Sequence, residues 1–184
     1  MKSPWKTKSS KVVYKNPWYR VRQDKVVRPD GKPGEYNVVE TQADACFIVP
    51  LSEKNEIYLI NQFRYPINEF SWEVPNGSSE GENLLKAAKR ELWEETGFTA
   101  GKVEKIGWFY SMNGISSEKC VVFAAFNLTI SGKDMKEEEG IFEVKKFSIK
   151  KILEMIKKGR IRDGQTIAAI IQTLLYLGDI GFRT

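Results

Sequence analysis

Residues 82–98 read ENLLKAAKRELWEETGF, and this stretch decides the fold. Its apolar residues recur at three- and four-residue spacing, which is typical of an amphipathic helix with one face on a core. We expect that face to carry Leu84, Leu85, Ala88 and Leu92. Gly97 predicts the end of the helix, because glycine readily adopts the left-handed conformation just past a helix C-terminus.

The same helix carries carboxylates that fall within about 100° of one another on its surface: Glu91, Glu94 and Glu95. Like charges at these separations repel each other, and the helix dipole disfavours negative charge near the C-terminus. Both costs are most easily tolerated when cations neutralise the cluster, and hard oxygen ligands suit Mg²⁺ or Mn²⁺. The open alternative is a solvated acidic face, the commoner reason for a Glu-rich helix.

Residues 90–98 resemble a known signature position by position. They match the core signature of the Nudix hydrolases: Arg-Glu, an aliphatic residue, any residue, Glu-Glu, any residue, Gly, then an aliphatic or aromatic residue. Glu82 also stands at the family's spacing before Arg90. The resemblance implies an α/β/α sandwich with a mixed sheet over about residues 43–180, and hydrolysis of a pyrophosphate bond with the help of divalent metal.

Carried over residue by residue, the resemblance implies these metal ligands: Glu91, Glu94 and Glu95. The metal would be Mg²⁺, with Mn²⁺ as a substitute. The backbone carbonyl of Asn76 would be a further ligand, because the residue before the loop glycine has that role in similar enzymes. Arg90 and Glu82 would hold the carboxylates in place. The alternative for these two is an ordinary surface ion pair of little energetic value.

The loop before the helix departs from the family pattern. The family places five residues between its loop glycine and its first glutamate, whereas four separate Gly77 from Glu82. Either the loop is one residue shorter with Gly77 in the same role, which we favour, or Asn76 takes the left-handed conformation instead, which asparagine tolerates.

Outside the helix, the chain resembles the branch of ADP-ribose and nucleoside-diphosphate-sugar pyrophosphatases. Residues 62–65 (QFRY) resemble its Arg-Gln-Tyr-Arg motif, and residues 72–77 (WEVPNG) its Glu-Leu-Pro-Ala-Gly segment. Arg64 would then hold the substrate phosphates, since a guanidinium fork matches two oxygens. The alternative is a structural ion pair with Glu73. Glu73 itself would contact substrate or a second subunit.

Members of this branch are usually homodimers in which the N-terminal strands complete the nucleotide pocket. Trp18 and Tyr19 could therefore stack on a base, with a place in the core as the open alternative. Glu118 resembles a branch glutamate near the metals or substrate. The loop at residues 111–116 lacks the proline typical of the ADP-ribose enzymes, so ADP-glucose and GDP-mannose become comparably plausible substrates.

The chain contains no histidine, so a general base must be a carboxylate, Lys, Tyr or Cys. The resemblance points to the loop before the last strand, where three glutamates are consecutive: Glu137, Glu138 and Glu139. Aligning the following strand with the branch favours Glu138. A run of carboxylates in a solvated loop more often contributes only solubility.

Composition indicates a soluble globular protein: 184 residues, 41% hydrophobic and 29% charged. The net charge of +5 comes with no basic stripe interleaved with aromatics, so nucleic acid is not the leading partner. No segment reaches the length of a membrane span, and no apolar signal peptide begins the chain. Cys46 and Cys120 are isolated in apolar surroundings. These features predict a cytoplasmic protein.

The chain divides into an N-terminal β extension at residues 1–42 and a Nudix domain at residues 43–184. Ser148 predicts the cap of one helix, and Asp163 or Gly164 the start of the last. The pattern predicts strands near residues 11–14, 19–27, 36–40, 45–51, 56–62, 70–74, 103–110, 121–128 and 142–147, and helices near 149–158 and 164–177.

The leading functional hypothesis is Mg²⁺-dependent cleavage of a nucleoside diphosphate sugar to a nucleoside monophosphate and a sugar phosphate. One alternative keeps the chemistry and changes the substrate to nucleoside triphosphates or dinucleoside polyphosphates. Another is a non-catalytic module that senses a nucleotide. Degenerate modules of that kind usually lose glutamates of the signature, and this chain keeps all of them.

Overall fold

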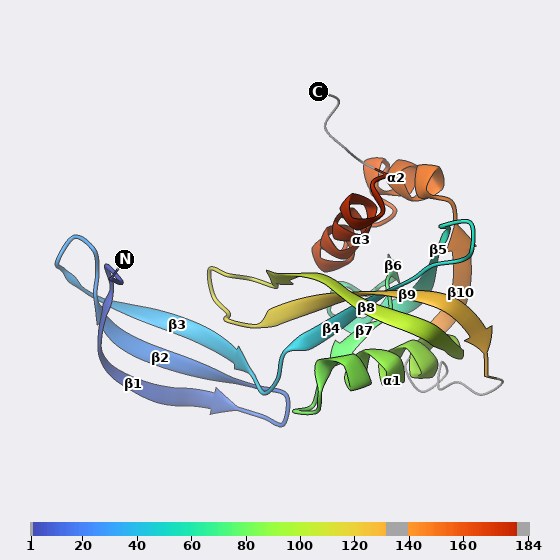
Figure 1. Cartoon of the computed structure of the whole chain (residues 1–184). Coiled ribbons are helices and arrows are strands. Elements are labelled where there is room, and N and C mark those ends of the chain that lie inside the picture. The colour runs from blue at the N-terminus through green and yellow to red at the C-terminus, as the bar shows by residue number, and fades with distance from the viewer. Residues whose placement is uncertain (1, 132–139, 180–184) are drawn as a thin grey trace.

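The computed structural model describes residues 2–131 and 140–179. A three-stranded N-terminal sheet extends away from a larger α/β body, and both are seen in Figure 1. In chain order the elements are β1 (Lys6–Lys15), β2 (Tyr19–Val27), β3 (Pro33–Thr41), β4 (Ala45–Pro50), β5 (Ile57–Arg64), the short 3₁₀ helix η1 (Tyr65–Ile67), β6 (Glu69–Glu73), β7 (Asn76–Ser78), α1 (Leu84–Thr96), β8 (Phe98–Tyr110), β9 (Lys119–Ile130), β10 (Ile141–Phe147), α2 (Ile149–Lys157) and α3 (Gly164–Leu177).

The N-terminal sheet is an antiparallel meander in the order β1-β2-β3. Every residue of β1 is exposed, so this sheet buries little of its own surface. Two hydrogen bonds join β3 to the loop after β8: the Val39 N–H donates to the Ile115 carbonyl at 2.8 Å, and the Tyr36 hydroxyl to the Gly114 carbonyl at 2.5 Å. The seven-stranded body is therefore linked to the meander through this loop as well as through the chain itself.

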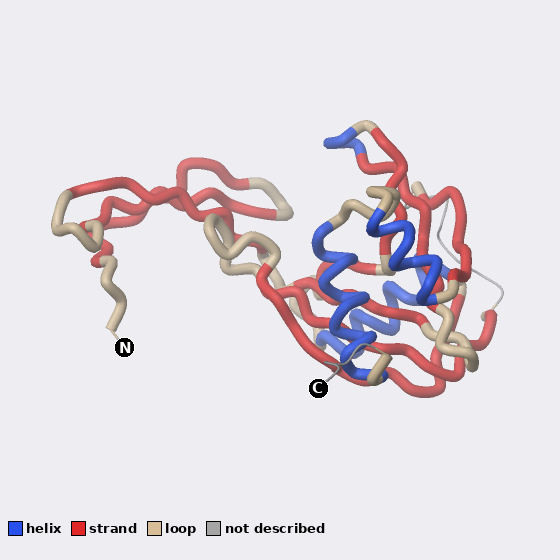
Figure 2. Tube along the Cα trace, turned by 90° about the horizontal axis from the view of Figure 1, so that it is seen from above, coloured by secondary structure: helices blue, strands red, loops and turns tan. Residues whose placement is uncertain are grey.

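The body contains a four-stranded sheet in the order β7-β4-β9-β8 and a three-stranded sheet in the order β10-β5-β6. β4 and β9 run parallel, while the other strand pairs are antiparallel. The predicted mixed sheet is confirmed. Figure 1 shows α1 on one side of the strands of the body and α2 and α3 on the other, and Figure 2 shows the meander as a separate arm.

Alternation along β4 and β9 divides the interior into two cores. Cys46 and Ile48 pack with α1, whereas Phe47 and Val49 pack with α2 and α3. A sheet with both faces covered needs strands that are apolar on both sides, which explains the continuous apolar run of β4. The structure thus confirms the predicted α/β/α arrangement.

Helix α1 ends at Gly97 as its sequence predicts, and it begins at Leu84, two residues after the expected Glu82. The side chain of Asn83 caps its N-terminus, and Gly97 ends it in the left-handed conformation with φ of 72°. The predicted apolar face is partly wrong, because Leu85 is 39% exposed and Ala87 is buried in its place. The buried face is rotated toward the line that contains Glu91 and Glu95, and Leu85 lies at its margin.

The C-terminal helices confirm their predicted caps. The Ser148 hydroxyl accepts the Lys151 N–H at the start of α2, and the Asp163 carboxylate accepts the Thr166 N–H at the start of α3. The sequence did not predict β7, because Asn-Gly-Ser is typical of a turn. This short strand forms by pairing with β4, where Asn76 lies opposite Phe47.

Candidate active site

The carboxylates of α1 face the interior of the body. Glu91 is 8% exposed and Glu95 is 2% exposed. A solvated acidic face is therefore the wrong interpretation of this helix. Buried carboxylates are retained only where partners offset the cost of desolvation, so their surroundings define the site.

Gly77 lies directly against Glu91. A Cβ atom added to Gly77 would overlap the Glu91 carboxyl group. Beside it, the Asn76 N–H donates to Glu95 Oε2 at 2.8 Å. Strand β7 thus contacts two carboxylates of α1: Gly77 packs against Glu91, and Asn76 forms a hydrogen bond with Glu95. Close approach of this kind is a role that only glycine fills.

The shortened loop keeps Gly77 in the position that we favoured. Asn76 is not among the described residues with positive φ, so the left-handed alternative is wrong. Glu80 and Gly81 have φ of 50° and 83°, and the Glu82 N–H donates to the Ser79 carbonyl at 2.8 Å. This tight turn closes the loop with one residue fewer than the family pattern.

Arg90 connects the acidic residues of the signature. Its Nε donates to Glu82 at 2.9 Å, and its Nη1 donates to Glu91 and Glu94 at 2.8 Å each. Its Nη2 donates to the Ser78 carbonyl at 3.0 Å. Burial disfavours the charged guanidinium, but the hydrogen bond to Glu82 and the charges of Glu91 and Glu94 raise the pKa of Arg90. The expected role of Arg90 and Glu82 in holding the carboxylates agrees with these contacts.

Within residues 2–131 and 140–179, no three His, Cys, Asp or Glu side chains converge as a ready-made metal site. Arg90 bridges Glu91 and Glu94, and Glu95 accepts the Asn76 N–H. The donor set is nevertheless entirely oxygen and largely buried, which fits a hard divalent cation. The assignment of the three glutamates and the Asn76 carbonyl as metal ligands stays a prediction.

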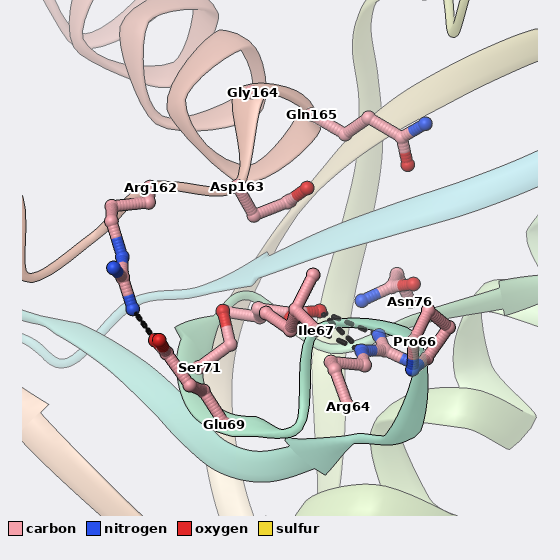
Figure 3. A pocket seen from close by; sticks show the side chains of 11 residues that line it. Arg64, Pro66, Ile67, Glu69, Ser71, Asn76, Arg162, Asp163, Gly164 and Gln165 are labelled. Atoms are coloured by element: carbon pink, nitrogen blue, oxygen red, sulfur yellow. Dashed lines mark hydrogen bonds and ion pairs between the residues drawn. The ribbon is translucent and has the colours of Figure 1, made fainter.

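A pocket of about 750 Å³ lies on the side of Asn76 that holds Arg64 and Asp163 (Figure 3). Its walls come from η1 and β6 on one side and from the α2–α3 connection on the other. The lining consists of Arg64, Pro66, Ile67, Glu69, Ser71, Glu73, Asn76, Arg162, Asp163, Gly164 and Gln165. No glutamate of α1 is in this lining, but Asn76 lines the pocket and its N–H also binds Glu95, so Asn76 is common to both features.

Arg64 lines the pocket and forms an ion pair with Glu73. Its Nη2 lies 2.5 Å from Glu73 Oε2 and its Nε 3.1 Å from Oε1. Burial opposes the charge, but the hydrogen bond and charge of Glu73 raise the pKa of Arg64, with contributions from Glu95 and Asp163. The structural ion pair with Glu73 is therefore present. Its position in the pocket leaves phosphate binding by Arg64 as a prediction.

The aromatic residues of the β1–β2 turn are exposed. Trp18 is 76% and Tyr19 38% exposed, so a place in the core is the wrong interpretation. Tyr19 contacts Tyr14, with ring centroids 5.7 Å apart. A stacking role for Trp18 and Tyr19 is left as the prediction that their exposure permits.

Glu118 lies just before β9, where its N–H donates to the Ser116 hydroxyl at 3.2 Å. Burial of the Cys120 thiol raises its pKa to about 12, and the negative charge of Glu118 contributes to this rise. The three candidates for the general base, Glu137, Glu138 and Glu139, lie outside the described residues. Their role stays a prediction.

Several pocket residues were not predicted as site residues. Asp163 has a clear sequence signal as a helix cap, but nothing in the sequence places it beside Arg64. Ser71, Glu69 and Arg162 carry no motif at all. Only the fold brings the turn after β5 and the start of α3 together, at a separation of about a hundred residues; Arg162 and Glu69 form an ion pair across it.

The mixed sheet has helices on both faces, and the glutamate-rich helix α1 lies against Gly77 of β7. This combination is that of a Nudix-type protein. The NUDIX domain profile matches residues 41–170, and the profile of the nucleoside diphosphate sugar hydrolase N-terminal domain matches residues 5–39. The chain belongs to the Nudix family and is a Nudix hydrolase.

Several relatives of known name are similar to it. The ADP-ribose pyrophosphatase of Bacillus subtilis is 32% identical over 144 residues, which cover 77% of each chain. A methanol dehydrogenase activator of Bacillus methanolicus is 26% identical over 170 residues, 90% of each chain. The GDP-mannose pyrophosphatase of Escherichia coli is 31% identical over 138 residues, 67% of this chain and 69% of its own.

A solved structure shares the overall fold. The crystal structure of an ADP compounds hydrolase superposes with a TM-score of 0.84 over 95% of both chains, at 18% sequence identity. None of the helices in the described part of the chain is long and apolar enough to cross a membrane.

Proposed function

We propose that this Nudix hydrolase cleaves the pyrophosphate bond of a nucleoside diphosphate sugar, giving a nucleoside monophosphate and a sugar phosphate. The observation that carries the proposal is the buried carboxylate face of α1, with Gly77 and Asn76 placed against it. The match of residues 5–39 to the N-terminal domain of nucleoside diphosphate sugar hydrolases supports the substrate class. The names of the Bacillus subtilis and Escherichia coli relatives agree with it.

In this proposal Glu91, Glu94, Glu95 and the Asn76 carbonyl hold Mg²⁺, for which Mn²⁺ substitutes. The bound metal supplies charge neutralisation for the pyrophosphate and the leaving phosphate. Arg90 and Glu82 keep the carboxylates oriented, as their hydrogen bonds indicate. Arg64 faces the pocket and binds a phosphate oxygen when its pairing with Glu73 is shared with substrate.

A glutamate of the 137–139 run, with Glu138 first, would accept a proton from the attacking water. Glu138→Gln should then lower kcat more than it raises KM. If Glu137→Gln or Glu139→Gln has that effect instead, the alignment of this loop is off by one residue.

The exposed meander suits a homodimer in which a second copy covers it and brings Trp18 and Tyr19 to the nucleotide. Exposed apolar side chains on β1, on the turn after it and at the start of β2 support this part of the proposal: Val12, Val13, Tyr14, Trp18 and Tyr19. Sedimentation of the full chain tests it. Two buried free thiols fit a reducing, cytoplasmic location.

The substrate class is tested with ADP-ribose, ADP-glucose, GDP-mannose, a dinucleoside polyphosphate and a nucleoside triphosphate, each with Mg²⁺ or Mn²⁺ and again with EDTA. Metal-dependent release of a sugar phosphate supports the proposal. Preferential cleavage of the polyphosphates would replace the sugar nucleotide. If every compound stays intact under both metals while one binds tightly, the chain is a sensing module.

A further inference from the structure

Most of the lining of the pocket of about 750 Å³ between β6 and α3 has no role in the proposed function. Asn76 lines it, and the Asn76 N–H binds Glu95 at 2.8 Å, so this residue connects the pocket to the carboxylate face. The pocket is therefore a candidate place for the group attached to a pyrophosphate held at that face. The question is which chemical group the lining suits.

The charges of the lining disfavour an anion. Its two arginines are each paired with a glutamate: Arg64 with Glu73, and Arg162 with Glu69. Asp163 adds a further carboxylate, so the formal charge of the lining is negative. Arg64 is the lining residue that the proposed function assigns to a phosphate oxygen. In the rest of the pocket the carboxylates would repel a further anion, whereas a neutral group with hydroxyls would meet hydrogen-bonding partners.

Asp163 is positioned to accept such a hydrogen bond. It extends from the start of α3 over the pocket, as Figure 3 shows. Its Oδ2 accepts the Thr166 N–H at 2.7 Å, which fixes the carboxylate, and a ligand hydroxyl can donate to Oδ1. The charge of Asp163 also raises the pKa of Arg64, in accord with the closeness of the two groups.

The opposite wall adds groups that fit a sugar ring. Ser71 on β6 is 8% exposed and presents a hydroxyl that can donate or accept. Pro66 and Ile67 of η1 supply an apolar surface for the carbon face of the ring. A pocket with a few polar groups among apolar ones is the usual form of a small-ligand site.

We infer that this pocket binds the glycosyl group of the substrate, and that Asp163 determines specificity by accepting a hydrogen bond from a sugar hydroxyl. The inference rests on the proposed function and adds the position of the sugar to it. The carboxylate face takes the pyrophosphate, and the pocket between β6 and α3 takes the neutral sugar.

The test compares a nucleoside diphosphate sugar with the same nucleoside diphosphate carrying a methyl ester in place of the sugar. Both have one pyrophosphate and the same charge, so the ratio of their kcat/KM values isolates the sugar. Asp163→Asn removes the charge and keeps the cap of α3, because asparagine caps helices as well as aspartate. We expect this ratio to fall about tenfold, the order of a hydrogen bond to a charged group.

Ser71→Ala is the second variant, from the opposite wall, and its ratio should fall several-fold in the same direction. Glu154→Gln is the matched control, since it removes one carboxylate on the exposed face of α2 and should keep the wild-type ratio. Wild-type ratios in both Asp163→Asn and Ser71→Ala would overturn the inference.

Failure of the proposed function is recognised separately. If the wild-type protein cleaves neither compound, calorimetric titration of both in EDTA measures binding alone. Tighter binding of the sugar compound that Asp163→Asn abolishes supports the sugar pocket without catalysis. Equal binding of the two compounds to the wild-type protein overturns it.

Discussion

Gly77 lies so close to Glu91 that any side chain at position 77 would overlap the carboxyl group of the glutamate. Glu91 is on α1 and Gly77 on β7, so this contact sets the distance between the helix and the strand. On the neighbouring pair, the Asn76 N–H binds Glu95. Together these contacts fix the position of β7 relative to α1, at the point where the loop to Glu82 is one residue shorter than the family pattern.

Gly77→Ala should displace Glu91 and lower both stability and turnover. Overpacking at a buried contact of this kind costs about 1–3 kcal/mol. We expect a fall in the free energy of unfolding of that size, with a larger relative loss of kcat, measured by urea denaturation and steady-state kinetics. Gly114→Ala is the control, because nothing lies within 4 Å of its added Cβ. Equal behaviour of the two variants would contradict the close approach.

Arg90→Lys should weaken the orientation of the acidic residues while keeping the charge. Lysine cannot reproduce the fork that binds Glu82, Glu91 and Glu94 together. Loss of such an orienting group typically costs about 10–100-fold in metal affinity or activity. A titration of activity against Mg²⁺ concentration measures the effect, and an unchanged midpoint and kcat would argue against it. Arg28→Lys, at an exposed turn pair with Asp30, serves as the control.

The two thiols should be unreactive in the native protein. Burial raises the pKa of Cys46 to about 12, with a contribution from the charge of Glu91, and the pKa of Cys120 to about 12 as well. Because a raised pKa keeps the proton on sulfur, the reactive thiolate form of both cysteines is scarce at pH 8. A thiol-specific disulfide reagent should label both only after denaturation in guanidinium. Rapid labelling of the native protein would show that the thiols are accessible.

Trp18→Ala should leave the fold intact and weaken nucleotide binding. The side chain is 76% exposed, so its removal changes the free energy of unfolding by less than about 1 kcal/mol. Stacking on a base contributes about 1–3 kcal/mol, so KM should rise by about tenfold or more. An unchanged KM would show that Trp18 does not bind the nucleotide. A large loss of stability would instead indicate that Trp18 is buried in a dimer interface.

Much of the body follows from the sequence, because its signals are local. These signals include the spacing of apolar residues along α1, Gly97 at its end, and the caps Ser148 and Asp163, each of which acts within a few residues. The helix pattern alone left a solvated acidic face open for Glu91, Glu94 and Glu95, and the resemblance of residues 90–98 to the Nudix signature favoured a site instead. Leu85 was misplaced because a helical pattern fixes which residues share a face, but only packing fixes the edges of that face.

The rest depends on contacts between distant segments. Asn76 belongs to a strand only because β4 lies beside it. Asp163 reads as a helix cap in the sequence, and its place over the pocket comes from the packing of α3 against the body. Thr166 adds a further long-range link, since its hydroxyl accepts the Val74 N–H at 3.3 Å. No local pattern contains this information.

The most direct test of the central claim is the kcat of Glu95→Gln on the best nucleoside diphosphate sugar with Mg²⁺. Glutamine can still accept the Asn76 N–H that Glu95 accepts, so the fold should persist with an unchanged unfolding midpoint. We predict that turnover is lost in Glu95→Gln and kept in Glu154→Gln. Near-wild-type turnover in Glu95→Gln would contradict the claim that this carboxylate face is the catalytic centre.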